Sequence, residues 1–284
     1  MIGVVGAGTM GVGVAQCAAE AGHRVVVVDS DPAALDSGPA RLRDGVRMSR
    51  LLGRTSKGTD QGVRWVRDLT ELREADFVVE CVRERIPVKE AVLRKLDEVC
   101  PPEAVFASCT SAIPITRLAS YTRRPAQVIG THFMNPAPLK DAVEVIRSPH
   151  TSAETLRRTT ELLDAMGKQA IVVRDAPGFV SNRVLMATVN DAARVVQEGT
   201  ADAVAVDRVF QECFGHAMGP LRTADLIGLD TVVDSLHVLL ACTGDTGYEP
   251  CELLAGLVAD GHTGRKSGRG FHTYRSLEKF SPAR

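Results

Sequence analysis

A histidine and a glutamate twelve residues apart, His132 and Glu144, have the residue types of a general-base pair. Imidazole titrates near neutrality, so His132 suits proton transfer to and from an alcohol. The segment NPAP at 135–138 has the composition of a turn. If strands at 128–132 and 143–146 flank this turn, Glu144 reaches the far ring nitrogen of His132. A carboxylate there would orient the ring and stabilise the imidazolium, as the acid of a Ser-His-Asp triad does.

The N-terminus carries a glycine pattern typical of dinucleotide binding. The sequence GAGTMG places Gly6, Gly8 and Gly11 in G-x-G-x-x-G, between an apolar segment and a stretch of small residues. In such a turn the first glycine allows the bend and the second lets the backbone approach a pyrophosphate, while the third allows helix and sheet to pack closely. The predicted helix begins near Thr9 and Met10, so its N-terminus offers N–H groups and a positive dipole end to the phosphates.

An acidic residue closes the second predicted strand. Asp29 follows the valine run at 25–28, eighteen residues after Gly11, and no arginine comes directly after it. A carboxylate at this place accepts hydrogen bonds from the adenosine ribose hydroxyls and repels a 2′-phosphate. Asp29 and the glycine turn therefore predict NAD rather than NADP. The alternative is a tight turn in some other α/β protein.

Short apolar strands alternate with helical stretches through the first half of the chain. Continuous Val and Ile runs are typical of parallel strands that are covered on both faces. The βαβ order predicts an α/β fold with a doubly wound sheet of the Rossmann type. The expected strands are 2–5, 25–28, 77–79, 105–107 and 128–130, and helices such as 10–21 and 89–100 fit between them.

The pattern changes after Pro177-Gly178, where the chain begins to read as helices, at 179–198, 203–213 and 231–243. We therefore expect an NAD-binding domain at 1–176 and an all-helical substrate and dimerisation domain at 177–284. The helix at 179–198 is apolar on more than one face and so needs burial on several sides, which favours a homodimer.

The bulk composition is that of a globular protein. The 284 residues are 44% hydrophobic and 24% charged with a net charge of −1, which gives no reason to expect nucleic acid or membrane as a partner. No run of 18 apolar residues predicts a transmembrane helix, and the start MIGVV lacks the features of a signal peptide. Seven scattered cysteines without a CxxC pair indicate free thiols in a reducing cytoplasm and no metal site.

These features lie within longer motifs, through which the chain resembles the 3-hydroxyacyl-CoA dehydrogenase family, including the bacterial 3-hydroxybutyryl-CoA dehydrogenases, over nearly its whole length. The motifs are GAGTMG at the start, DFVVECVRE at 76–84, FASCTSAIPIT at 106–116, HFMNPAPLKDAVEV at 132–145, DAPGFVSNR at 175–183, MGPLRTADLIGLD at 218–230 and GRKSGRGFHTY at 264–274. Together they are far more specific than the glycine turn alone.

The resemblance implies an enzyme that interconverts a (3S)-3-hydroxyacyl thioester and the 3-oxoacyl thioester with NAD, using His132 and Glu144 as its catalytic dyad. Ser111 matches the family serine that contacts the substrate hydroxyl near the nicotinamide. Asn135 and Asn182 match two asparagines of the same site, where amide N–H groups polarise an oxygen. Asn182 has a structural alternative as the cap of the helix that follows it.

Three charged residues match family positions that touch NAD: Glu84, Lys89 and Lys266. For the first two, the alternative is an ion pair on the surface of a helix. The chain also departs from the family. Cys109 stands where the family usually has asparagine, and Asp141 stands where lysine is common. A cysteine cannot make the hydrogen bonds of an amide, so the usual active-site network is in doubt there.

A basic segment follows the second predicted strand. Arg43, Arg47, Arg50 and Arg54 are spaced four, three and four residues apart, which places them on one face of a predicted helix. This face is either solvated surface or a docking surface for phosphates. The phosphates would be those of CoA, or the phosphopantetheine and acidic helix of an acyl carrier protein. The residues of 41–57 that make the segment basic are Arg41, Arg43, Arg47, Arg50, Arg54 and Lys57, against the single acid Asp44.

Other functions remain open on the sequence alone. The same oxidation on an acyl-carrier-protein substrate, such as glyceryl to 2-hydroxy-3-oxopropionyl in polyketide extender-unit biosynthesis, is favoured by the basic segment and by Cys109. A sugar-acid dehydrogenase is a further enzyme alternative, although HFMNP and MGPL favour the acyl members. A non-enzymatic NAD-binding or structural relative is the alternative of another class. The complete set of His132, Glu144, Ser111 and Asn182 argues against it.

Overall fold

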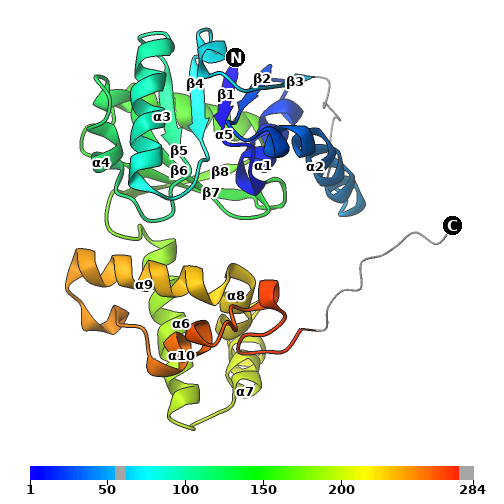
Figure 1. Ribbon diagram of the computed structural model, residues 1–284, viewed down its shortest axis with the longest axis vertical. Coiled ribbons are helices and arrows are strands. Elements are labelled where there is room, and N and C mark those ends of the chain that lie inside the picture. Colours follow the sequence, from blue (N-terminus) through cyan, green and yellow to red (C-terminus); the bar gives the residue numbers. More distant parts are fainter. Residues whose placement is uncertain (55–61, 275–284) are drawn as a thin grey trace, which may run out of the picture. The chain divides into compact units, whose positions relative to one another are not determined.

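The structure is a computed structural model that describes residues 1–54 and 62–274 (Figure 1). The chain divides into two compact units, Met1–Phe179 and Val180–Arg284. The division falls close to the boundary expected at 176. Lys57, the last member of the predicted basic segment, lies outside the described residues.

The first unit is built on an eight-stranded sheet whose strands lie in the order β3-β2-β1-β4-β5-β6-β7-β8. Neighbouring strands are parallel except β6 and β7, which are antiparallel. The order 3-2-1-4-5-6 is the doubly wound arrangement of dinucleotide-binding domains, in which the strand order reverses between β1 and β4. The strands are β1 (Ile2–Val5), β2 (Val25–Val28), β3 (Val63–Val66), β4 (Phe77–Glu80), β5 (Val105–Ser108), β6 (Val128–Phe133), β7 (Ala142–Arg147) and β8 (Gln169–Arg174).

Helices cover both faces of this sheet, and each face has its own apolar cluster. Val14 and Leu163 belong to one cluster, whereas Leu93 and Leu118 belong to the other. The side chains of the central strands are therefore buried on both faces of the sheet. This burial explains why the sequences of these strands are unbroken apolar runs. The helices of this unit are α1 (Thr9–Glu20), α2 (Pro32–Leu51), α3 (Ile86–Val99), α4 (Ile115–Ala119) and α5 (Ala153–Ala165), with short helices η2 (Leu69–Leu72), η3 (Pro125–Gln127) and η4 (Ala137–Leu139).

Two strands of the sheet were not predicted, and both contain exposed side chains. β3 carries the exposed Arg64, and in β8 Ile171 and Val172 are about half exposed. Such strands lack the continuous burial that makes a strand recognisable from its sequence. The strands expected at 2–5, 25–28, 77–79, 105–107 and 128–130 are present, some of them longer than expected.

The second unit is helical, as predicted, and encloses a separate core that includes Val189, Leu221 and Leu236. The helix expected at 203–213 is α-helical only to Arg208 and continues as a π-helical turn, Val209–Cys213. The helices of this unit are α6 (Ser181–Gln197), α7 (Ala203–Arg208), α8 (Pro220–Ile227), α9 (Leu229–Thr243) and α10 (Glu252–Ala259), with short helices η6 (Thr246–Tyr248) and η7 (Arg265–Ser267).

Over residues 1–54 and 62–274, no single helix is long and apolar enough to cross a membrane. The pair α8 and α9, bent by 99° between Ile227 and Leu229, reaches that length and composition only when taken together.

Candidate active site

The glycine turn between β1 and α1 has the geometry that a pyrophosphate requires. Gly6 has a φ of 106°, and a Cβ placed there would lie 2.6 Å from the carbonyl oxygen of Cys81. A Cβ at Gly11 would lie 1.8 Å from the Gly6 carbonyl oxygen, so only glycine fits. At Gly8 nothing lies within 4 Å of such a Cβ, and no side chain caps α1 there. The N-terminus of α1 therefore presents its N–H groups on an open surface that fits the NAD phosphates.

Asp29 follows β2 directly, and its side chain contacts the backbone of the glycine turn. One of its carboxylate oxygens accepts the backbone N–H of Ala7 at 2.6 Å, and the other accepts that of Asp31 at 2.9 Å. Arg41, on α2, reaches this turn as well. Its guanidinium donates hydrogen bonds to the backbone carbonyl oxygens of Ala7 at 2.6 Å and Ala34 at 3.0 Å.

His132 and Glu144 face each other across β6 and β7, as the turn between them predicted. They are direct partners in the antiparallel register, and His132 Nδ1 lies 3.0 Å from Glu144 Oε2. Their side chains are only 7% and 8% exposed, so this contact is largely shielded from water. A carboxylate at Nδ1 fixes the ring orientation and favours the tautomer whose basic nitrogen is Nε2.

The loop between β6 and β7 is held by a buried lysine that the sequence did not single out. Lys168 Nζ donates to the carbonyl oxygens of Ala137, Pro138 and Lys140, at 2.9, 3.1 and 2.6 Å. Three carbonyl oxygens satisfy the three donors of an ammonium group. Lys168 therefore fixes the loop that joins the two strands of the dyad and carries Asn135.

Ser111 lies in the turn that follows β5, and Glu84 accepts hydrogen bonds from this turn. Its carboxylate accepts the hydroxyl of Thr110 and the backbone N–H groups of Ser111 and Ala112, the last two at 2.9 and 3.0 Å. Burial alone would raise the pKa of Glu84, but the Lys89 ammonium and these three donors outweigh it and lower the pKa. The ionised carboxylate thus stabilises the backbone around the predicted substrate serine.

Lys89 lies beneath this turn and is fully buried. Its ammonium binds both carboxylate oxygens of Glu80, at 2.8 and 2.9 Å, and lies 3.2 Å from Glu84. Burial acts to lower the pKa of Lys89, but the two carboxylates outweigh it and raise the pKa. The interpretation of Glu84 and Lys89 as a surface helix pair is therefore wrong, because the Lys89 side chain is only 1% exposed. A direct contact of either residue with NAD stays a prediction.

Three of the four arginines of the predicted basic face lie on α2, and the prediction is wrong for the fourth, Arg54. Helix α2 ends at Leu51, so Arg54 lies beyond it and cannot extend a helical face. Its guanidinium instead binds the carboxylate of Asp141 and the carbonyl oxygen of Leu139. The other three members remain exposed on α2, and we call them the α2 arginines: Arg43, Arg47 and Arg50.

Two of the predicted site residues belong to the second unit. Asn182 is the second residue of α6, which begins at Ser181, so it does not stand at the position before the helix that a capping residue occupies. Lys266 lies in η7, with its ammonium 2.6 Å from an Asp230 carboxylate oxygen. Their contacts with substrate and NAD stay predictions. Asn135, of the first unit, is exposed after β6.

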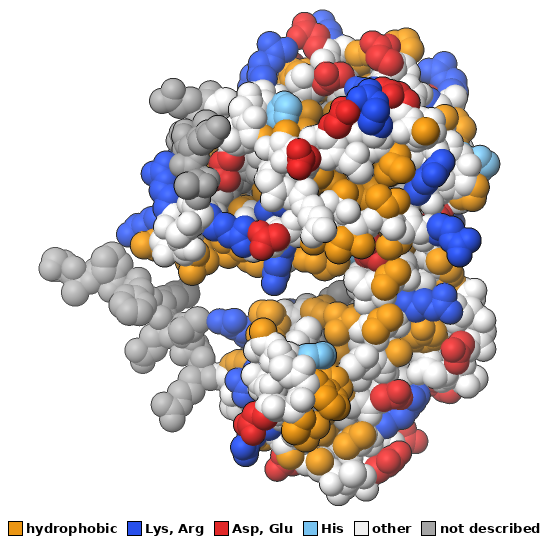
Figure 2. Space-filling view, turned by 180° about the vertical axis from the view of Figure 1, so that it is seen from behind, with side chains coloured by type: hydrophobic (Ala, Val, Ile, Leu, Met, Phe, Trp, Pro, Cys, Tyr) orange, Lys and Arg blue, Asp and Glu red, His pale blue; other side chains and the backbone are white. Residues whose placement is uncertain are grey.

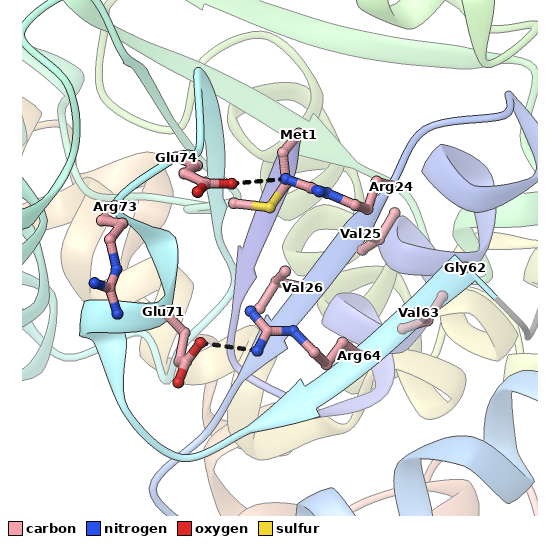
Figure 3. Close-up of a pocket in the computed structure, with 10 residues that line it drawn as sticks. All are labelled: Met1, Arg24, Val25, Val26, Gly62, Val63, Arg64, Glu71, Arg73 and Glu74. Atoms are coloured by element: carbon pink, nitrogen blue, oxygen red, sulfur yellow. Dashed lines mark hydrogen bonds and ion pairs between the residues drawn. The ribbon is translucent and has the colours of Figure 1, made fainter.

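A cavity of about 460 Å³ lies at the end of the sheet opposite the glycine turn (Figure 3). Its walls include the amino ends of β1, β2 and β3, and four of its charged side chains form two ion pairs, Arg24 with Glu74 and Arg64 with Glu71. Ligands of open parallel sheets bind at the carboxyl ends of the strands. A smaller groove of about 280 Å³, between α1, α2 and residues 135–139, lies on the carboxyl side and includes the predicted site residues Thr9 and Asn135 in its lining.

Both halves of the chain match one enzyme family. Residues 1–176 match the NAD-binding domain of 3-hydroxyacyl-CoA dehydrogenase, and residues 178–274 match the C-terminal domain of the same enzyme. Together the two matches span most of the chain and meet where the sequence changes character.

The chain is also similar to individual members of this family over nearly the full length of both proteins. The chain is 44% identical to a probable 3-hydroxybutyryl-CoA dehydrogenase of Bacillus subtilis, over 95% of this chain and 96% of the relative. It is 40% identical to the 3-hydroxybutyryl-CoA dehydrogenase of Bradyrhizobium diazoefficiens, over 98% and 96%. The crystal structure of (S)-3-hydroxybutyryl-CoA dehydrogenase from Ralstonia eutropha matches with a TM-score of 0.91 and 36% identity, covering 97% of this chain and 99% of that one. The chain therefore belongs to the 3-hydroxyacyl-CoA dehydrogenase family and is an NAD-dependent oxidoreductase that acts on the CH–OH group of 3-hydroxyacyl-CoA.

Proposed function

We propose that this dehydrogenase interconverts a short-chain (3S)-3-hydroxyacyl-CoA, such as 3-hydroxybutyryl-CoA, and the 3-oxoacyl-CoA, with His132 as the general base. His132 takes the hydroxyl proton at Nε2 while the hydride of the same carbon passes to the nicotinamide. Glu144 stabilises the imidazolium that results. The reacting oxygens are assigned to Ser111 and Asn182, and Asn135 is assigned to the cofactor.

The buried contact between His132 Nδ1 and Glu144 at 3.0 Å is the observation that carries this proposal. An oriented imidazole with a carboxylate partner is the arrangement that proton abstraction from an alcohol needs, and such help contributes about 10²–10⁴-fold in rate. The choice of a short acyl chain rests on the similarity to enzymes that are named for 3-hydroxybutyryl-CoA.

The NAD contacts that we assign lie in both units. The turn residues Gly6, Gly8 and Gly11 and the first turn of α1, Thr9 and Met10, would hold the pyrophosphate. The adenosine ribose is assigned to Asp29, and the nicotinamide end to Glu84, Lys89, Asn135 and Lys266.

An assay of NADH consumption with acetoacetyl-CoA tests the proposed substrate. The same enzyme preparation should be given longer 3-oxoacyl-CoA substrates and a 3-oxoacyl group on an acyl carrier protein, at matched concentrations. We expect the highest kcat/KM with acetoacetyl-CoA. A clearly higher value with the carrier protein would replace this proposal by the second candidate.

The second candidate is oxidation of a hydroxyacyl group on an acyl carrier protein, and the exposed α2 arginines favour it. Arg47→Glu with Arg50→Glu would reverse two of these charges. Attraction between opposite charges acts mainly on the encounter rate and is screened by salt. The double variant should therefore raise KM for the preferred thioester, flatten its salt dependence and leave kcat unchanged. A short thioester without nucleotide or carrier is the control, and its KM should not move.

We also propose that two copies of the chain pair through the helical unit. Val184 on α6 is 61% exposed and Phe214 is 64% exposed. Hydrophobic side chains gather on the surface of this unit (Figure 2), and a groove of about 370 Å³ runs beside Val184, Phe210 and Met218. Exposed apolar patches of this kind mark interaction sites. Light scattering at micromolar concentration should give twice the chain mass, and a monomer would refute the pairing.

A further inference from the structure

Two cysteines lie side by side at the carboxyl edge of the sheet. Glu80 and Ser108 are register partners on β4 and β5, and Cys81 and Cys109 follow them directly. Adjacent strands are about 4.7–4.9 Å apart, which lies within the range of about 4.4–6.8 Å between Cα atoms that a disulfide spans. The two sulfur atoms are 3.3 Å apart, and Cys81 donates its S–H to Cys109. The pair can therefore be joined without a rearrangement of the backbone.

This thiol pair belongs to the part of the sheet that receives the cofactor. The Cys81 carbonyl oxygen would lie 2.6 Å from a Cβ at Gly6, and the Cys81 Cβ would lie 3.5 Å from one at Gly11. Cys81 thus borders the glycine turn, at the point between β1 and β4 where the strand order reverses. The sulfur of Cys109 lies 4.0 Å from the hydroxyl oxygen of Thr131, the residue before His132.

The remaining cysteines differ from this pair. Cys17, Cys100 and Cys251 are buried, and burial raises the pKa of Cys17 to about 12 and that of Cys100 to about 11. Such thiols are inert because the thiolate is the reactive form. Cys213 and Cys242 are exposed in the second unit. Cys109 is half-buried, so a small oxidant can reach it, and the sulfur of Cys81 is in contact with it.

We propose that Cys81 and Cys109 form a redox modification site, in which hydrogen peroxide converts the two thiols to a disulfide and bound NAD slows that conversion. The thiolate of Cys109 attacks one oxygen of the peroxide, so that an S–O bond forms as the O–O bond breaks, and the other oxygen takes up a proton from the solvent and leaves as water. The sulfur of Cys81 then attacks the sulfenic acid of Cys109, so that the S–S bond forms and a second water leaves. Two electrons pass from the sulfurs to the peroxide, and a dithiol returns them.

The direction of the hydrogen bond decides which sulfur attacks first. The hydrogen bond to Cys109, together with burial, raises the pKa of the Cys81 thiol. Cys81 therefore keeps its proton and acts as the resolving thiol. Cys109 accepts this hydrogen bond and is therefore the sulfur that attacks the peroxide.

Peptide mapping of the oxidised protein tests the site directly. The variant Cys213→Ser with Cys242→Ser removes the exposed thiols and leaves five of the seven cysteines. After treatment with hydrogen peroxide, thiol titration should fall from five to three per chain. Mass spectrometry should find the Cys81 and Cys109 peptides joined, and dithiothreitol should separate them. With NAD⁺ at ten times its dissociation constant, only about one chain in eleven is free of cofactor, so the rate should fall about tenfold.

Single variants in the same background complete the test. Cys109→Ser and Cys81→Ser should each abolish the joined peptide, and Cys109→Ser should also leave Cys81 unoxidised for longer. Separate sulfinic acids without a joined peptide, or a rate that NAD⁺ does not change, would overturn the proposal. Because the readout is the sulfur chemistry, a different acyl substrate from the one proposed above would not alter the result.

Discussion

The ring of Phe179 meets the ring of His132 edge to face, with 6.0 Å between the ring centroids and 61° between the ring planes. Phe179 is buried and has a φ of 53°, a left-handed conformation that phenylalanine rarely adopts. Such conformations cost on the order of 1–3 kcal/mol and persist where the surroundings enforce them, often at functional sites. Phe179 is thus a second constraint on the His132 ring, in addition to Glu144.

Replacing Phe179 should impair turnover more than cofactor binding. Phe179→Leu removes the aromatic edge from the His132 ring, and a small misplacement of a reacting group costs up to about 10²-fold in rate. We expect kcat to fall about tenfold or more while the dissociation constant for NADH stays the same. Phe77→Leu is the matched control, because Phe77 is equally buried in the same unit. If both variants lost the same fraction of kcat, the effect would reflect stability alone.

The buried pair of Glu80 and Lys89 should matter for stability. Lys89→Met leaves the Glu80 carboxylate buried without its counter-ion, which typically costs about 3–5 kcal/mol. We expect urea unfolding to show a loss of that order in the free energy of unfolding. The double variant Glu80→Gln with Lys89→Met removes the charge that Lys89→Met leaves unpaired at Glu80, and it should recover part of the loss. A double variant as unstable as the sum of the two single variants would show that the pair is not coupled.

Glu84 should contribute stability that depends on pH. Its pKa in the folded protein is lowered, so folding favours the ionised form, and the contribution is present above the unfolded pKa of about 4.3. The contribution is lost as the pH falls through the lower folded pKa. Glu84→Gln should therefore be less stable than the unsubstituted protein at pH 7, and the gap should close below about pH 4. A gap in the free energy of unfolding that is constant from pH 7 to pH 3 would contradict this assignment.

Asp29 should select the cofactor. Its carboxylate is fixed at the glycine turn by Ala7, and the nearby Arg41 is bound to carbonyl oxygens. The negative charge repels a 2′-phosphate, so kcat/KM should be at least about tenfold higher with NADH than with NADPH, or about 1.4 kcal/mol. Asp29→Asn removes the charge and should narrow the ratio. Equal kcat/KM values with NADH and NADPH for the unsubstituted protein would contradict the assignment of cofactor selection to Asp29.

Short sequence motifs correctly predicted those parts of the site whose residues lie close together in the chain. The glycine turn, Asp29 and the facing of His132 and Glu144 each depend on a short segment whose composition fixes its conformation. The sequence could not show contacts between distant segments, such as Phe179 on His132 or Lys168 on the loop at 137–140. Residue types at those positions are common in any core or surface, so spacing alone gives no signal.

Errors arose at element boundaries and in partly exposed strands. The basic spacing predicts that Arg54 lies on the same helix as Arg50, but α2 ends at Leu51, before the spacing does. β3 and β8 were missed because their exposed side chains break the apolar run. The contact between Cys81 and Cys109 requires the register of β4 and β5, which follows only from the three-dimensional structure.

The turnover number of His132→Ala, measured with acetoacetyl-CoA and NADH at saturation, tests the central claim that His132 is the general base. Removing the imidazole should lower kcat by about 10²–10⁴-fold. NADH binding, followed by fluorescence titration of the same preparation, should be unchanged because the glycine turn and Asp29 hold the cofactor. Glu144→Gln, which keeps a hydrogen-bonding group but removes the charge, should lose less activity than His132→Ala. A His132→Ala enzyme that kept most of its kcat while binding NADH normally would contradict the claim.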